Sequence, residues 1–103
     1  MTRPQSLPSN TTKISTGHGS MFVTVGSMDD KPVEVLVSIG KSGSCDRAWA
    51  EALTRAICLC LQYKVPIEEL VYQLRGIQCD AGGDDYPKSP ADGIAKILSE
   101  YIS

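Results

Sequence analysis

A short loop rich in glycine and hydroxyl residues, with one lysine, holds the residues best suited to chemistry in this sequence. It lies between a predicted strand at 33–39 and a predicted helix at 46–63. Backbone N–H groups and the positive end of a helix dipole can bind an anion at such a loop, and Lys41 would add a mobile positive charge. We therefore predict a phosphate-type binding site whose residues are Gly40, Lys41, Ser42, Gly43 and Ser44.

This loop does not have the spacing of the P-loop found in nucleoside triphosphatases. That motif would require a glycine at the position of Val35, inside the predicted strand. Walker-type hydrolysis of nucleoside triphosphates is therefore not expected. A structural interpretation stays open, in which the glycines make a tight strand-to-helix turn and Ser44 or Asp46 caps the helix.

The size and composition of the chain are those of one small globular domain. It has 103 residues, of which 42% are hydrophobic and 21% are charged, and its net charge is -2. This charge gives no general attraction for nucleic-acid polymers or anionic membranes, so any anion site must be local. No apolar run is long enough to span a bilayer or to form a signal peptide. We expect a cytoplasmic protein whose four cysteines are free, metal-bound or redox-active rather than paired in structural disulfides.

Residues 1–14 are predicted to form a flexible arm, and residues 15–103 a single domain. The arm is rich in Pro, Ser, Thr and Asn, which bury too little apolar surface to order a chain. The domain begins with two strands, at 21–25 and 33–39, whose connecting turn makes them an antiparallel hairpin. Two strands alone are marginally stable in water, so helices must cover their apolar face.

Three helices are predicted after the hairpin, at 46–63, 66–75 and 90–102, the last with Ser89 as its N-cap and Pro90 at its first position. The fold class is therefore α+β, an antiparallel β-hairpin covered by about three helices. The side of the first helix that faces the core is expected to contain Trp49, Leu53, Ala56, Ile57 and Cys60. Its opposite side is polar and has Cys58 in the middle, where this thiol is either exposed or covered by another subunit. This thiol and the small core favour a homo-oligomer, with its contact near Arg47, Glu51, Arg55 and Cys58.

Six segments, in the same order and over nearly the whole chain, resemble the TSCPD domain. They are residues 16–25, 32–35, 40–43, 51–55, 73–79 and 89–96. This module is found near the C-terminus of cobalamin-dependent ribonucleotide reductases and also as small free-standing proteins. The catalytic barrel of those enzymes does not fit into 103 residues. The resemblance therefore does not make this chain a reductase, but it implies a module that accompanies nucleotide chemistry.

The resemblance also bears on metal binding. Members of the family commonly carry four cysteines that would suit tetrahedral zinc, and the matching positions here are His18, Cys45, Cys79 and Pro90. Proline has no ligand atom, so the fourth corner is open unless a nearby acid fills it, namely Asp80, Asp84 or Asp85. Two alternatives remain: a three-residue site of His18, Cys45 and Cys79, or a turn histidine with two free thiols.

Two functions follow, and both stay open. The first is a non-catalytic homo-oligomer that binds or sequesters a nucleotide-type phosphate ligand, as small phage-encoded proteins can, with Arg55 reaching a larger ligand or a neighbouring chain. The second is a zinc- or thiol-containing structural accessory that docks on a ribonucleotide reductase or another enzyme. An independent enzyme has little support, because one histidine and no defensible Cys/His spacing leave few groups for acid–base chemistry.

Overall fold

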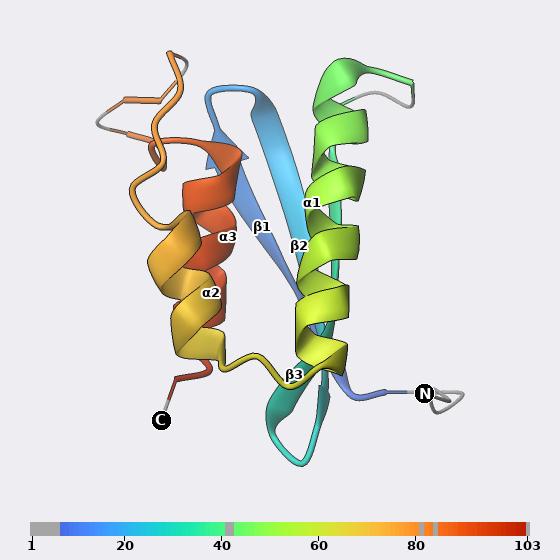
Figure 1. Ribbon diagram of the computed structural model, residues 1–103. Helices are drawn as coiled ribbons and strands as arrows, with labels where there is room; N and C mark the ends of the chain where they lie inside the picture. The colour runs from blue at the N-terminus through green and yellow to red at the C-terminus, as the bar shows by residue number, and fades with distance from the viewer. Residues whose placement is uncertain (1–6, 41–42, 81, 84, 103) are drawn as a thin grey trace.

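The computed structural model has the predicted α+β architecture, a three-stranded antiparallel sheet with three helices (Figure 1). It describes residues 7–40, 43–80, 82–83 and 85–102. The strands lie in the order β1-β2-β3. The elements are β1 (Ser9–Thr16), β2 (Gly19–Met28), β3 (Lys31–Ile39), α1 (Cys45–Gln62), α2 (Ile67–Leu74) and α3 (Pro90–Ser99). In the described part of the chain, no helix is both long and apolar enough to cross a membrane.

Strand β1 corrects the predicted flexible arm over residues 9–14, because the chain is already paired from Ser9 onwards. Its partners run from Gly26 opposite Ser9 to Gly19 opposite Thr16. Most β1 side chains are exposed, so this strand is held by backbone hydrogen bonds to β2 more than by burial. The composition of this segment did not indicate a strand. Composition reflects how much apolar surface a segment can bury, whereas β1 is stabilised by backbone hydrogen bonds to a neighbouring strand.

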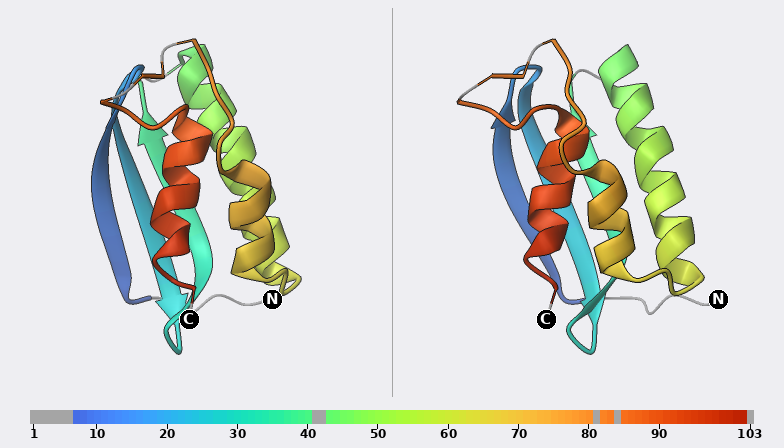
Figure 2. Two further views of the ribbon diagram at one scale, coloured as in Figure 1. Left: turned by 90° about the vertical axis from the view of Figure 1, so that its left-hand side faces the viewer. Right: turned by 60° about the vertical axis from the view of Figure 1, so that its left-hand side comes forward.

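All three helices lie on one face of the sheet (Figure 2). Helix α1 packs along β3, α3 packs on β1 and β2, and α2 packs against α3. The largest fully buried side chains lie between the two layers: Met21, Val23, Val25, Val35, Ile57, Ile94 and Leu98. The other face of the sheet is open, with Phe22 and Leu36 among its exposed apolar side chains.

Helix α1 is rotated relative to the prediction, and this corrects the expected burial of Trp49. The Trp49 side chain is 77% exposed, while Ala50, Thr54 and Ile57 are buried. A threonine can occupy the inner side because the Thr54 hydroxyl donates to the Ala50 carbonyl at 2.9 Å, which satisfies the polar group inside the helix. The prediction assumed that the largest apolar residue faces the core, and that assumption fails here.

The same rotation places Cys58 against the free edge of β3. The Cys58 Sγ lies 3.4 Å from the Val35 backbone nitrogen, which donates to it, and 3.2 Å from the Val35 carbonyl oxygen, to which the thiol donates. An unpaired strand edge is a site of unwanted association, and covering it with a helix is a common protection. Cys58 is thus half-buried inside its own subunit, which removes the thiol as an argument for a subunit contact on that side of α1.

We expect Cys58→Ala to lower the free energy of unfolding by about 1–2 kcal/mol, because it leaves the Val35 N–H and carbonyl without their thiol partner. Chemical denaturation of both proteins measures this difference. The matched control is Cys58→Ser, because its hydroxyl keeps a donor and an acceptor beside the Val35 backbone. Equal effects of the two substitutions would contradict the proposed protection of the β3 edge.

Candidate functional site

Three connecting segments meet at one end of the molecule: the β1–β2 turn, the loop before α1 and the loop after α2 (Figure 1). Each carries residues that the sequence analysis singled out. Two sites result on either side of the first turn of α1. One is a cluster around His18, and the other is a groove between α1 and β3.

The β1–β2 turn is built to present His18. The buried hydroxyl of Thr16 donates to the Gly19 carbonyl at 2.7 Å and accepts from the His18 backbone N–H at 3.0 Å. Gly19 has a φ of 104°, a backbone conformation that side chains disfavour. The turn is therefore fixed by its own sequence, and His18 lies at its tip.

His18 connects a cysteine and a carboxylate that come from different elements. The Cys79 Sγ lies 3.5 Å from His18 Nε2, and Asp46 Oδ2 lies 3.5 Å from His18 Nδ1. Cys79 belongs to the loop after α2, where its N–H donates to the Lys88 carbonyl at 2.9 Å. The Cys79 thiol, the His18 ring and the Asp46 carboxylate are therefore in line, which allows a proton to pass between the thiol and the imidazole. The carboxylate favours the ring tautomer with a proton on Nδ1. We call these three residues the His18 cluster.

The His18 cluster contains two of the three predicted zinc ligands, His18 and Cys79. The third, Cys45, is exposed, and its neighbour Asp46 contacts the histidine instead. Across the described ranges, no group of three or more His, Cys, Asp and Glu is arranged to hold a metal ion, and Asp84 lies outside those ranges. The zinc site stays a prediction. The sequence analysis missed the thiol–imidazole contact because the two residues are 61 positions apart.

On the other side of α1 lies a groove of about 460 Å³, which we call the α1 groove. It is open to solvent and runs between β3 and the N-terminal half of α1. Its lining residues are Leu36, Val37, Gly43, Ser44, Arg47, Ala48, Glu51 and Thr54. The predicted anion loop therefore forms one end of a groove that is large enough for a small ligand.

The described glycines of the loop are required by its conformation. Gly40 has a φ of 68°, and a Cβ there would lie 3.0 Å from Ser44 Oγ, while Gly43 has a φ of 83°. Ser44 is the N-cap of α1, and its hydroxyl accepts from the Arg47 N–H at 3.2 Å. The structural interpretation of Ser44 is thus confirmed. It is compatible with anion binding, because a capped helix still directs N–H groups of its first turn outwards.

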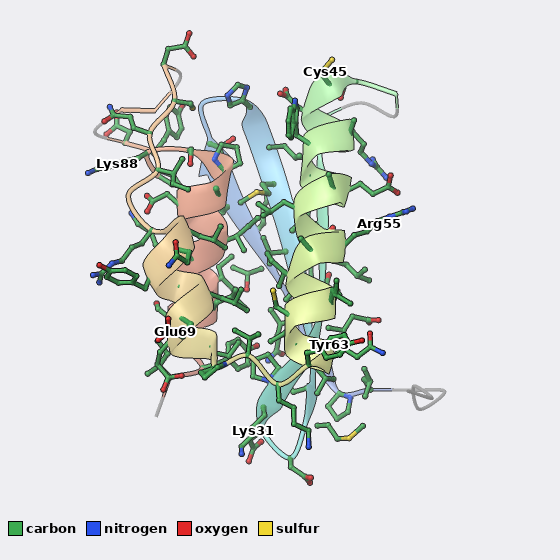
Figure 3. All side chains as sticks on the ribbon, in the orientation of Figure 1. Lys31, Cys45, Arg55, Tyr63, Glu69 and Lys88 are labelled. Atoms are coloured by element: carbon green, nitrogen blue, oxygen red, sulfur yellow. The ribbon has the colours of Figure 1, made fainter. Side chains whose placement is uncertain are left out.

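Two arginines of α1 differ in their relation to the groove. Arg47 lines it and was missed by the sequence analysis, although it is three residues after the N-cap. Arg55, which was predicted to bind the ligand, is not among the described lining residues. Its side chain is 78% exposed, points to the side away from α2 and α3 (Figure 3) and lies 3.6 Å from Glu51. Lys41 and Ser42 lie outside the described residues.

The TSCPD domain family model matches residues 1–102 of this chain. The chain belongs to the TSCPD domain family. Its curated relatives include the vitamin B12-dependent ribonucleotide reductases of Streptantibioticus cattleyicolor and Streptomyces coelicolor, each 29% identical over 102 residues. The match covers 96% of this chain but 16% and 10% of those two proteins. No solved structure gives a significant match.

The TSCPD match confirms the resemblance found in the sequence and extends it. The family model covers residues 1–102, which includes the segment that was assigned to an arm outside the domain. The chain spans only a small part of the reductases that it resembles. The sheet and helices described above form this small domain, and no catalytic barrel is present in the described ranges.

Proposed function

We propose that this TSCPD domain is a non-catalytic module that binds a small nucleotide-type ligand in the α1 groove. The observation that carries the proposal is the position of Gly43, Ser44 and Arg47 at one end of a 460 Å³ groove. A helix N-terminus, a positive-φ glycine and an arginine are three features that favour phosphate. The groove adds what the loop alone lacked, which is space for the rest of a nucleotide.

Each part of the α1 groove suits a different part of such a ligand. The phosphate would lie against the loop and Arg47, whose guanidinium can donate two parallel hydrogen bonds to it. Val37 gives apolar surface for a base. Glu51 would accept a hydrogen bond from a sugar hydroxyl, and its charge is offset by the nearby Arg55 at 3.6 Å.

A second groove of about 420 Å³ is less suited to an anion. Its lining includes Ser9, Ser27, Asp30 and Glu100, and two of these side chains are carboxylates. Two negative charges would repel a phosphate. The charges of the lining residues therefore favour the α1 groove.

Isothermal titration calorimetry against a panel of mono-, di- and cyclic nucleotides tests this function. We expect Lys41→Ala to weaken binding by about 1.5–3 kcal/mol, the range for hydrogen bonds to charged groups, which is about 10- to 150-fold in affinity. Thermal denaturation of the variant should be unchanged. Absence of nucleotide binding by the wild type, or equal binding by the variant, would defeat the proposal.

A structural accessory role is the second candidate, and two observations favour it. The chain corresponds to a small part of the vitamin B12-dependent ribonucleotide reductases that it resembles, and His18 contacts Cys79 as two zinc ligands could. Metal analysis of the purified protein separates the candidates. If zinc is bound, we expect His18→Ala and Cys79→Ala to release it and to leave nucleotide binding by the α1 groove largely intact.

A further inference from the structure

An apolar stripe runs along the outer side of α1, the side that faces away from the sheet. Its largest members are Trp49, Tyr63 and Leu59, whose side chains are 77%, 76% and 55% exposed. All its members are exposed: Cys45, Trp49, Ala52, Ala56, Leu59 and Tyr63. Figure 3 shows Cys45 and Tyr63 at opposite ends of the helix. We call these six residues the outer stripe.

The spacing of the outer stripe is that of a coiled-coil seam. Successive members are separated by four, three, four, three and four positions, which is the a/d pattern of a heptad repeat. The opposite side of the helix holds the buried Thr54. An ordinary surface helix has one apolar side, directed to its own core. Helix α1 has a second apolar side with the spacing used to pack against another helix.

We propose that the outer stripe is the interface of a symmetric homodimer, in which α1 packs antiparallel against α1 of a second copy. The six positions are palindromic about residue 54. A two-fold axis there places Trp49 opposite Leu59 and Ala52 opposite Ala56 of the other copy, and Cys45 opposite Tyr63. The small central alanines allow the helices to approach closely, while the large residues pack on either side of them.

The helix dipoles favour the antiparallel orientation. In an antiparallel pair, the positive N-terminal end of each α1 lies beside the negative C-terminal end of the other copy, whereas a parallel pair brings like ends together.

The outer stripe is large enough for a stable contact. Burial of Trp49 and Tyr63 in both copies would remove on the order of 600 Å² from water. The remaining stripe residues and the flanking side chains bring the total to about 1,000 Å², the lower limit for a specific interface.

The proposed dimer uses a different surface of α1 from the one expected from the sequence. That expectation centred on Cys58, whose sulfur contacts Val35 inside the subunit. The outer stripe lies on a different side of α1, leaves the α1 groove accessible and does not depend on the proposed function.

Light scattering of the purified protein at tens of micromolar tests the dimer. We expect the wild type to have twice the 11.1 kDa mass of the chain, and Leu59→Glu to have the mass of one chain. The matched control is Phe22→Glu on the open face of the sheet, since Phe22 and Leu59 are both exposed apolar residues, at 43% and 55%. It should remain dimeric. A monomeric wild type, or a dimeric Leu59→Glu, would overturn the proposal. A monomeric wild type would indicate that the outer stripe binds a different protein.

Cysteine cross-linking in a Cys45→Ser background tests the orientation. With Ala52 opposite Ala56, the double variant Ala52→Cys/Ala56→Cys should form disulfide-linked dimers at least ten times faster than either single variant. Circular dichroism confirms that each variant is folded. A single variant that cross-links as fast as the double variant would show a parallel pair and overturn the antiparallel register.

Discussion

Replacing Asp92 by alanine is expected to lower the free energy of unfolding by about 3–5 kcal/mol, the largest effect that we expect of any polar substitution in this chain. The Asp92 side chain is 6% exposed. Its Oδ1 accepts from the Gly76 N–H at 2.7 Å, and its Oδ2 accepts from the Lys88 N–H at 3.0 Å. Alanine would leave both donors without this acceptor. A loss of this size is a large part of the total stability of a small domain.

The position of Asp92 in the fold explains why one carboxylate matters so much. Gly76 follows the end of α2, Lys88 ends the loop that carries Cys79, and Asp92 itself lies in the first turn of α3. The capping hydroxyl of Ser89 accepts from the Asp92 N–H at 3.1 Å, as the sequence predicted for the start of α3. The side chain of Asp92 thus joins α2, α3 and the loop after α2.

The contribution of Asp92 should depend on pH. Burial alone would raise the pKa of Asp92, but the hydrogen bonds from Gly76 and Lys88 and the charge of Lys96 lower it below 3.8. A group whose pKa is lower in the folded state stabilises the protein above its unfolded pKa. That stability is lost as the pH falls through the folded pKa. The difference between wild type and Asp92→Asn should therefore be constant near neutrality and shrink below about pH 4.

Urea denaturation from pH 7 to pH 3 measures both effects. Asp85→Ala is the control, because Asp85 is an exposed acid in the same part of the chain. If Asp92→Ala and Asp85→Ala have equal midpoints at pH 7, the joining role assigned to Asp92 is wrong.

Arg47→Ala is expected to weaken nucleotide binding by about 2–3 kcal/mol, or 30- to 150-fold, while Arg55→Ala changes it less than threefold. Both variants remove an arginine from α1, so their global charge effects are the same. They differ in that Arg47 lines the α1 groove, whereas Arg55 is 78% exposed and paired with Glu51. Calorimetry with one nucleotide and all three proteins gives the comparison. Equal losses in the two variants would show a general charge effect and remove Arg47 from the site.

The elements with strong local patterns could be predicted from the sequence. The alternating valines of β3, the helical period of α1 and the Ser-Pro start of α3 all gave the correct type of element. Strand β1 has no such pattern, since it is a polar edge strand that depends on β2. The rotation of α1 was also missed, because an internal hydrogen bond makes Thr54 compatible with burial while Trp49 remains outside.

The candidate site was predictable only in its local part. The loop with Gly43 and Ser44 is contiguous in sequence, so its turn and helix cap could be recognised. The walls of the α1 groove depend on how α1 docks on β3, and that packing also decides that Arg47 lines the groove while Arg55 does not. The contact between His18 and Cys79 joins residues from distant segments. No sequence spacing indicates such a contact.

The location of the ligand is tested most directly by following backbone amide signals in a nuclear magnetic resonance titration with a nucleoside diphosphate. The proposed function predicts that the largest shifts occur at Gly43, Ser44 and Arg47, and that they saturate with the affinity measured by calorimetry. The second groove, which contains Asp30 and Glu100, is called the acidic groove here. The signals of its residues Ser9, Ser27 and Glu100 should stay unchanged. Shifts confined to the acidic groove, or no saturable shift at the first turn of α1, would contradict a nucleotide site in the α1 groove.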